Sequence, residues 1–290
     1  MLLASSSTKN NTNVRKVSRQ MPPLLRAGLG WLGGTFPETT TKIAYSLFTS
    51  PRRHPRPKRE QATLEGACAI RIPTGSGPLA GWVWGRGPTV LLVHGWEGRG
   101  SQLGHLVAPL LAAGFSVATF DAPGHGETSG RRSNVLAFAD AIQAAARALG
   151  PLHAVVAHSM GAAATLYAMT ADTQLPRLVL VAPADASKAV PRFTRFMGFG
   201  EAVKAGLEQG LNDKLGVSPA RLSGPALASR INAPMLVIHD RSDKMVPYSD
   251  GVRIASKAPN GQIIATTGLG HHRILRDPQV INDIADFIRR

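Results

Sequence analysis

The chain has 290 residues, 43% of them hydrophobic, which is enough for one large domain with a well-buried core. Its formal net charge is +15 at pH 7, and residues 1–60 hold 11 Lys and Arg against 2 Asp and Glu, so the basic excess is concentrated near the start. No zinc-finger, RRM-like or basic-zipper pattern accompanies this charge, so we expect no nucleic-acid partner.

The apolar runs and the cysteine content indicate where the protein works. The run at the start is too short for the core of a signal peptide, and no stretch approaches the roughly 18 apolar residues that span a bilayer. The only cysteine, Cys68, excludes an intrachain disulfide, which fits a reducing compartment. We therefore expect a cytoplasmic protein, whose oligomeric state the sequence does not indicate.

A basic tail, residues 1–59, precedes the expected globular domain at 60–290. Residues 1–20 are rich in Ser, Thr, Asn and basic side chains, a composition that predicts disorder. Residues 21–50 carry apolar residues at helix-like spacing and predict two short amphipathic helices, whereas the prolines of residues 51–57 predict a stiff, extended linker. This tail either packs on its own domain or makes peripheral contact with an anionic membrane.

The domain alternates short apolar runs with longer helical stretches. The strand candidates are Ala69–Ile72, Trp82–Trp84, Thr89–Val93, Phe115–Phe120, Ala154–Ala157, Leu178–Val181, Met235–His239 and Ile263–Thr266. The helix candidates are Ser101–Ala113, Val135–Leu149, Gly161–Thr170 and Val280–Arg290. Continuous apolar strands joined by helices predict an α/β fold with a mainly parallel sheet covered on both faces, and the first two runs predict a hairpin at one edge. The long segment at about 184–229 predicts a small helical cap over the site.

A serine lies at the turn between the strand Ala154–Ala157 and the helix that follows it. A sharp strand-to-helix turn exposes a serine hydroxyl and directs the amino end of the helix at developing negative charge, so Ser159 is the candidate nucleophile. Such a nucleophile needs amide donors for the oxyanion. We expect these from Trp96, in the loop after Thr89–Val93, and from Met160.

The acid and base of a hydrolase should follow the serine, on loops after later strands. Asp243 follows Met235–His239 and would hold an imidazole in the right tautomer, and His271 follows Ile263–Thr266 and would take and return the serine proton. Three alternatives stay open: Asp240 and Asp185 for the acid, and His272 for the base.

The turn-rich loop Asp121–Gly130 contains a further histidine, His125. Its glycines and proline fix a tight backbone path, so we expect a structural role for the loop and no catalytic role for His125. The remaining histidines are scattered without metal-ligand spacing, so we expect no metal site.

Together these motifs resemble the α/β-hydrolase family from about Ala69 to Ile288. The resemblance rests on His94-Gly95, Asp121 to Gly130, His158 to Gly161, Asp243 to Pro247 and Gly268 to His271. It implies an α/β-hydrolase fold with about eight strands, no cofactor, an acyl-enzyme mechanism, and Asp243 and His271 as partners of Ser159. Two positions depart from the family's pattern, because Ala157 and Asp240 stand where glycine is common.

The sequence therefore predicts a serine hydrolase that cleaves a carboxylic ester, thioester or lactone of a small molecule through an acyl-enzyme on Ser159. The same residues would serve an acyltransferase. A noncatalytic binding protein on the same scaffold is the alternative from another class, because a fold alone does not fix chemistry.

Overall fold

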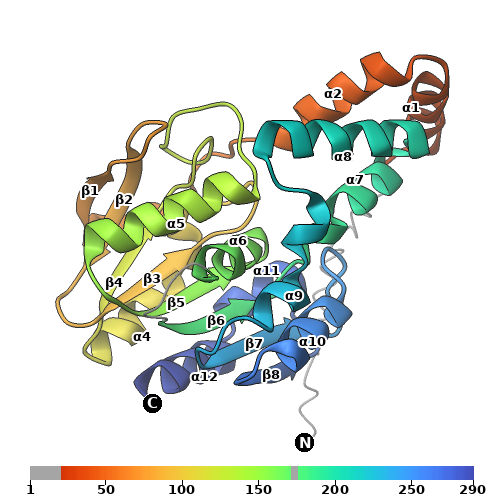
Figure 1. The fold of residues 1–290 in the computed structure, drawn as a ribbon. Helices are drawn as coiled ribbons and strands as arrows, with labels where there is room; N and C mark the ends of the chain where they lie inside the picture. Colours follow the sequence, from red (N-terminus) through yellow and green to blue (C-terminus); the bar gives the residue numbers. More distant parts are fainter. Residues whose placement is uncertain (1–20, 171–175) are drawn as a thin grey trace, which may run out of the picture.

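An eight-stranded sheet forms the centre of the protein in the computed structural model, which describes residues 21–170 and 176–290 (Figure 1). The predicted disorder of residues 1–20 lies outside the described residues. The strands, in chain order, are β1 (Cys68–Ile72), β2 (Leu79–Trp84), β3 (Thr89–Val93), β4 (Ser116–Phe120), β5 (Leu152–His158), β6 (Arg177–Val181), β7 (Met235–Asp240) and β8 (Gly261–Thr266).

The strand order across the sheet is β1-β2-β4-β3-β5-β6-β7-β8. β1 and β2 form an antiparallel hairpin at one edge, and β2 also runs antiparallel to β4. All pairs from β4 to β8 are parallel. The predicted α/β fold, with its edge hairpin and mainly parallel sheet, is confirmed.

Helices cover both faces of this sheet (Figure 1). One face packs against α5 (Val135–Leu149), α6 (Met160–Met169), α9 (Gly224–Ala228) and α10 (Tyr248–Lys257). The other packs against α4 (Val107–Ala112) and α12 (Pro278–Arg289), with the short 3₁₀ turns at Gly100–Leu106 and Ile274–Arg276. The central strands are buried on both faces, which explains why they are apolar without alternation.

A helical lobe stands out from the sheet between β6 and β7 (Figure 1). It contains α7 (Ala189–Met197) and α8 (Glu201–Leu215), which share an apolar core with the N-terminal helices α1 (Pro23–Thr35) and α2 (Pro37–Thr49). The segment 21–50 is thus packed on the domain. By contrast α9 contributes Leu227 and Ala228 to the core beside the sheet, so the lobe ends before α9.

The proline-rich segment 51–57 is extended and held to the domain by its arginines. Arg53 donates to the backbone carbonyls of the loop 124–130, and Arg52 donates twice to Glu97. Arg56 pairs with Glu127. The segment therefore runs across the loops at the carboxyl ends of the strands and brings α2 to the same end of the sheet.

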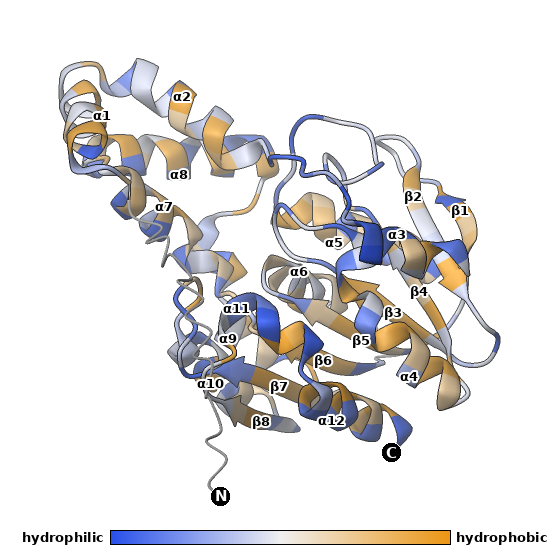
Figure 2. Cartoon of the chain, turned by 180° about the vertical axis from the view of Figure 1, so that it is seen from behind, coloured by the Kyte–Doolittle hydropathy of each residue, from blue (hydrophilic) through white to orange (hydrophobic). Residues whose placement is uncertain are grey.

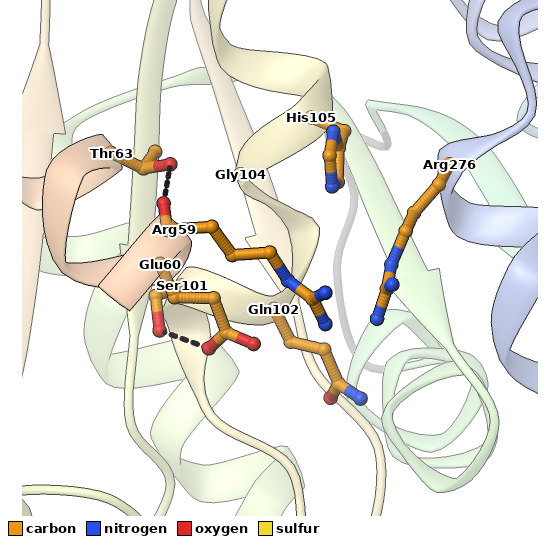
Figure 3. A pocket seen from close by; sticks show the side chains of 8 residues that line it. All are labelled: Arg59, Glu60, Thr63, Ser101, Gln102, Gly104, His105 and Arg276. Atoms are coloured by element: carbon orange, nitrogen blue, oxygen red, sulfur yellow. Dashed lines mark hydrogen bonds between the residues drawn. The ribbon is translucent and has the colours of Figure 1, made fainter. Parts of the chain in front are cut away.

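The short helix α3 (Lys58–Glu65) anchors the start of the domain (Figure 3). Glu60 is buried there, where it accepts hydrogen bonds from Arg99 and from the Ser101 hydroxyl. A small cavity of about 60 Å³ adjoins these residues, with Arg276 on its far side. A buried carboxylate with two partners is a structural anchor, because leaving it unpaired would cost several kcal/mol, roughly 3–5 by analogy with other buried pairs.

Candidate active site

Ser159 sits at the sharp turn from β5 into α6. Its backbone adopts φ 55° and ψ −118°, a conformation that non-glycine residues rarely take and that commonly marks a functional site. The turn lies beside the end of β3, and a methyl group added at Gly161 would overlap the carbonyl oxygen of His94. Gly161 thus lets the first turn of α6 approach the loop after β3.

Replacement of Gly161 with Ala is expected to destabilise the protein by about 1–3 kcal/mol, because the new methyl group forces β3 and α6 apart. Gly34→Ala, in α1, is the matched control: nothing lies within 4 Å of the added methyl, and alanine favours the helix. Urea unfolding measures both free energies. A Gly161→Ala protein as stable as the control would contradict the close approach.

His271 contacts Ser159, and Asp243 contacts His271, each from the segment that follows a later strand. The Nε2 atom of His271, in α11 (Gly270–Arg273), lies 3.0 Å from the Ser159 hydroxyl oxygen. Its Nδ1 atom lies 2.7 Å from an oxygen of Asp243, in the loop between β7 and α10. The structure therefore brings together the three side chains that the sequence analysis named for nucleophile, base and acid.

The two alternative candidates for the acid, Asp240 and Asp185, have other partners. Asp240, at the end of β7, accepts from the Thr266 hydroxyl and from the Leu269 amide, so it braces the loop that carries His271. Asp185 accepts from Ser187 and from the Gly224 amide, at the base of the lobe. Within the described residues neither carboxylate is found in a hydrogen bond or ion pair with a histidine.

Asp243 is buried and held in its charged form. Its side chain has no exposed surface, and burial alone would raise the pKa of the carboxyl. Hydrogen bonding to His239 and His271 outweighs burial and lowers the pKa well below the ordinary value. The amides of Met245 and Val246 also donate to its second oxygen. The carboxylate is therefore ionised, and oriented, throughout the neutral pH range.

Two buried histidines that the sequence analysis did not single out shape this site. His158 precedes the serine, and its Nε2 lies 3.0 Å from the backbone oxygen of His271. Burial, then the charge of His271, lowers the pKa of His158 well below its ordinary value, so it is neutral and donates to that oxygen. His239, on β7, lies 3.4 Å from Asp243. Both histidines lie at the ends of strands, close in sequence to Ser159 and Asp243, and this position could have indicated that they belong to the site.

The loop after β3 holds one peptide group rigidly. Ala122 donates its amide to Nε2 of His94, so the Nδ1–H of His94 donates to the carbonyl oxygen of Gly95 at 2.7 Å. Gly98 donates its amide to the same oxygen. The N–H of Trp96 belongs to this peptide group and points away from the fixed oxygen. Within the described residues no hydrogen bond to the Trp96 amide is found.

The second candidate donor, Met160, is the first residue of α6. The first amides of a helix have no partner within the helix, and they lie at its positive end. Met160, the residue after Ser159, and Trp96 also both line the same cavity. These positions fit two amides that face one oxygen atom, although that assignment remains a prediction.

His125 lies behind Trp96, with ring centroids 5.2 Å apart, and takes no part in the Ser159 contacts. Its Nε2 is buried without a partner, and burial lowers its pKa from 6.5 to about 4. Below pH 6.5 the unfolded chain therefore binds a proton at His125, whereas the folded protein does not until the pH approaches 4. The contribution of neutral His125 to the free energy of unfolding is complete above pH 6.5 and is lost as the pH falls towards the pKa of the folded state.

We expect the free energy of unfolding to fall by about 1.4 kcal/mol per pH unit below pH 6 for such a group. His125→Phe keeps the ring packing on Trp96 and Phe138 and removes the titration, so its stability should fall less between pH 7 and pH 5. Urea unfolding at the two pH values measures the difference. Equal losses in the two proteins would contradict the role of His125.

A cavity of about 630 Å³ lies between the lobe and the carboxyl ends of the strands. Most of its lining is apolar, and it is contributed by α2, α7, α8 and the loops around Ser159. Its acidic side chains are engaged: Glu97 pairs with Arg52, and Asp185 accepts from Ser187. Within the described residues no group of three His, Cys, Asp or Glu is placed to hold a metal ion.

Comparisons with known proteins find similarity to hydrolases. The family model described as serine aminopeptidase, S33, matches residues 87–209. The chain is 26% identical over 223 residues to the lysophosphatidylserine lipase ABHD12 of Danio rerio, a match that covers 70% of this chain and 58% of that protein. It is 24% identical over 240 residues to the pimeloyl-[acyl-carrier protein] methyl ester esterase of Aromatoleum aromaticum, a match that covers 66% of this chain and 94% of that protein.

Among solved structures, an esterase of Pyrococcus furiosus superimposes with a TM-score of 0.62 at 19% identity, over 83% of this chain and 98% of that one. At this identity the likeness concerns the fold. Its agreement with the eight-stranded sheet, the serine turn after β5 and the family-model match supports one conclusion. The chain therefore has the α/β-hydrolase fold.

Proposed function

We propose that this protein hydrolyses carboxylic esters with an apolar acyl group, through an acyl-enzyme on Ser159. Ester hydrolysis in general is supported by the lipase and esterase relatives. The single observation that carries the finer proposal is the chain of contacts from Asp243 through His271 to the Ser159 hydroxyl, at 2.7 and 3.0 Å. In this geometry Nε2 of His271 is the free acceptor for the serine proton.

In the first half-reaction the Ser159 oxygen attacks the ester carbonyl carbon as its proton moves to Nε2 of His271. The carbonyl oxygen becomes negative and is met by the amides of Trp96 and Met160, each worth roughly 3–4 kcal/mol in comparable sites. The bond to the alcohol oxygen then breaks, and the alcohol leaves with the proton from His271. Asp243 stabilises the imidazolium while it lasts.

In the second half-reaction water gives a proton to Nε2 of His271 and attacks the acyl carbon. The bond to Ser159 breaks, the serine regains the proton, and the carboxylic acid departs. Microscopic reversibility gives the imidazole the same two roles in reverse order. An alcohol in place of water would yield a new ester, which is the acyltransferase alternative.

The character of the cavity favours an ester over a peptide substrate. An aminopeptidase must hold a free α-ammonium group, for which an unpaired carboxylate is the natural partner. The cavity's two carboxylates, Glu97 and Asp185, are already bonded within the protein. The apolar lining, by contrast, suits the hydrocarbon part of an acyl chain.

A fluorophosphonate probe tests the proposal, because it phosphonylates an activated serine. We expect labelling of the wild-type protein, loss of labelling in Ser159→Ala, and preference for p-nitrophenyl esters of medium over very short acyl chains. A folded wild-type protein that neither labels nor turns over esters would reject the enzyme and favour a noncatalytic binding protein. Product analysis with added alcohol distinguishes hydrolysis from acyl transfer.

A further inference from the structure

Most of the exposed large apolar residues belong to the N-terminal helices and the neighbouring α7. Figure 2 shows these helices side by side, away from the sheet. We call these residues the apolar face: Leu24, Leu25, Trp31, Leu32, Phe36, Ile43, Leu47 and Phe196. Elsewhere in the described residues only Met245, Val252 and Ile263 are large, apolar and exposed. Scattered apolar residues are ordinary on a protein surface, whereas a gathered patch marks an interaction site.

The helices that carry the apolar face are packed firmly on the lobe. Buried Ala44 of α2 lies in one core with residues of α7 and α8, and the rings of Phe48 and Phe193 meet edge to face at 5.2 Å. Arg26 of α1 donates to the carbonyl of Arg195 in α7. The exposed residues are therefore the outer side of helices whose inner side is already covered.

The charges around the apolar face are predominantly basic. The elements α1, α2 and α7 contain four basic residues, Arg26, Lys42, Arg192 and Arg195, against one acidic residue, Glu38. Residues 1–20, which precede α1 in the sequence, contain four basic residues and no acidic one. Arg192 pairs with Asp250, and Arg26 donates to a backbone carbonyl, so of the four only Arg192 has its charge paired with a carboxylate within the described residues. Apolar side chains flanked by basic ones complement a surface of anionic headgroups over hydrocarbon.

The apolar face also borders the cavity beside Ser159. Leu47 is 50% exposed and Phe196 is 48% exposed, and both line that cavity. A molecule that enters the cavity past these two side chains thus passes from the apolar face directly into an apolar space. None of the described helices is long and apolar enough to cross a membrane.

We propose that the apolar face docks on the surface of an anionic lipid bilayer, with Leu24, Leu25 and Trp31 inserted among the lipids. The docked orientation places the border of the cavity against the source of apolar ester substrates. A lipid surface fits better than a second copy of the chain, because two basic faces would repel each other. Docking does not depend on catalysis and can be tested separately from the proposed function.

The full-length protein is mixed with phosphatidylcholine vesicles, with and without phosphatidylglycerol, and bound protein is measured by flotation. We expect binding to the anionic vesicles that weakens as salt rises, and a loss of about tenfold or more in the combined variant Leu24→Ser, Leu25→Ser, Trp31→Ser. Brominated lipids should quench the fluorescence of Trp31, which is 65% exposed, and this quenching should be lost in the triple variant, which retains Trp82, Trp84 and Trp96.

The matched control is Val252→Ser with Ile263→Ser, which removes side chains that are 38% and 39% exposed outside the apolar face. The control should bind like the wild type, and both variants should hydrolyse a water-soluble short ester at the wild-type rate. Equal vesicle binding by all three proteins would overturn the proposal. So would a wild-type dimer that the triple variant converts to a monomer without either protein binding vesicles.

Discussion

Replacement of His271 with Gln is expected to lower kcat by roughly 10⁴-fold or more while the protein stays folded. The Nε2 atom of His271 is the acceptor 3.0 Å from the Ser159 hydroxyl. Glutamine has no group that takes a proton near neutral pH, so the serine would remain a weak nucleophile. The amides of the site and the cavity would still bind substrate, which is why some activity above that of water should persist.

His272→Gln is the matched control, since it makes the same chemical change one residue further along. His272 is exposed, and its ring is 5.1 Å from that of His271, whose Nε2 holds the contact with Ser159. We expect its kcat to stay within about threefold of the wild type, a change below 1 kcal/mol. Steady-state kinetics and circular dichroism compare the variants. A larger loss in His272→Gln than in His271→Gln would reverse the assignment of the base.

The architecture could be predicted from the sequence because its elements are long and strongly patterned. The range predicted for a strand at Thr89–Val93 and that for a helix at Val135–Leu149 coincide with β3 and α5. Asn134 accepts from the amides of Leu136 and Ala137, which fixes the start of α5. Both faces of the central strands are buried, so continuous apolar runs correctly indicated a parallel sheet.

The finer arrangement of the candidate site depends on backbone turns that a residue pattern does not encode. Asp240 and Asp243 are three residues apart, and the turn between them, closed by a bond from the Asp243 amide to the Asp240 carbonyl, points their side chains at different loops. The bond from His158 to the His271 backbone joins residues 113 positions apart. Neither could be derived without the register of β5, β7 and β8.

The position of the N-terminal helices was equally open in the sequence. Their apolar spacing was compatible with a membrane or with the domain, because amphipathicity shows that one side is covered but not by what. The structure shows α2 against α8, where Gly206 lies so close to Thr41 that an added methyl would be 2.8 Å from its hydroxyl. Small residues at such contacts permit close helix packing, and their significance emerges only once both helices are placed.

Replacement of Asp243 with Asn is expected to lower kcat by about 10³- to 10⁴-fold with little change in stability. The Asn carbonyl can still accept from the amides of Met245 and Val246, which keeps the loop in place. Its NH₂ group, however, would face Nδ1 of His271, where the carboxylate now accepts a hydrogen bond from Nδ1–H. The imidazole would then carry its proton on Nε2, the atom that must receive the serine proton.

Asp240→Asn makes the identical change three residues earlier and should have the opposite profile. Asp240 accepts from Thr266, Leu269 and the Ser242 amide, so an NH₂ group in place of one oxygen would leave a buried donor facing another donor. We expect the free energy of unfolding to fall by about 1–3 kcal/mol, while kcat falls much less than in Asp243→Asn.

Urea unfolding and steady-state kinetics on both variants give a two-way comparison in which each residue controls for the other. The proposed roles require the larger kinetic loss at Asp243 and the larger stability loss at Asp240. A stable Asp240→Asn protein with the greater kinetic loss would make Asp240 the acid and leave the 2.7 Å contact between Asp243 and His271 without a catalytic function. The comparison distinguishes the two roles because both carboxylates are buried and hydrogen-bonded but have different partners. Asp243 contacts the imidazole of His271, whereas Asp240 contacts the backbone of Leu269.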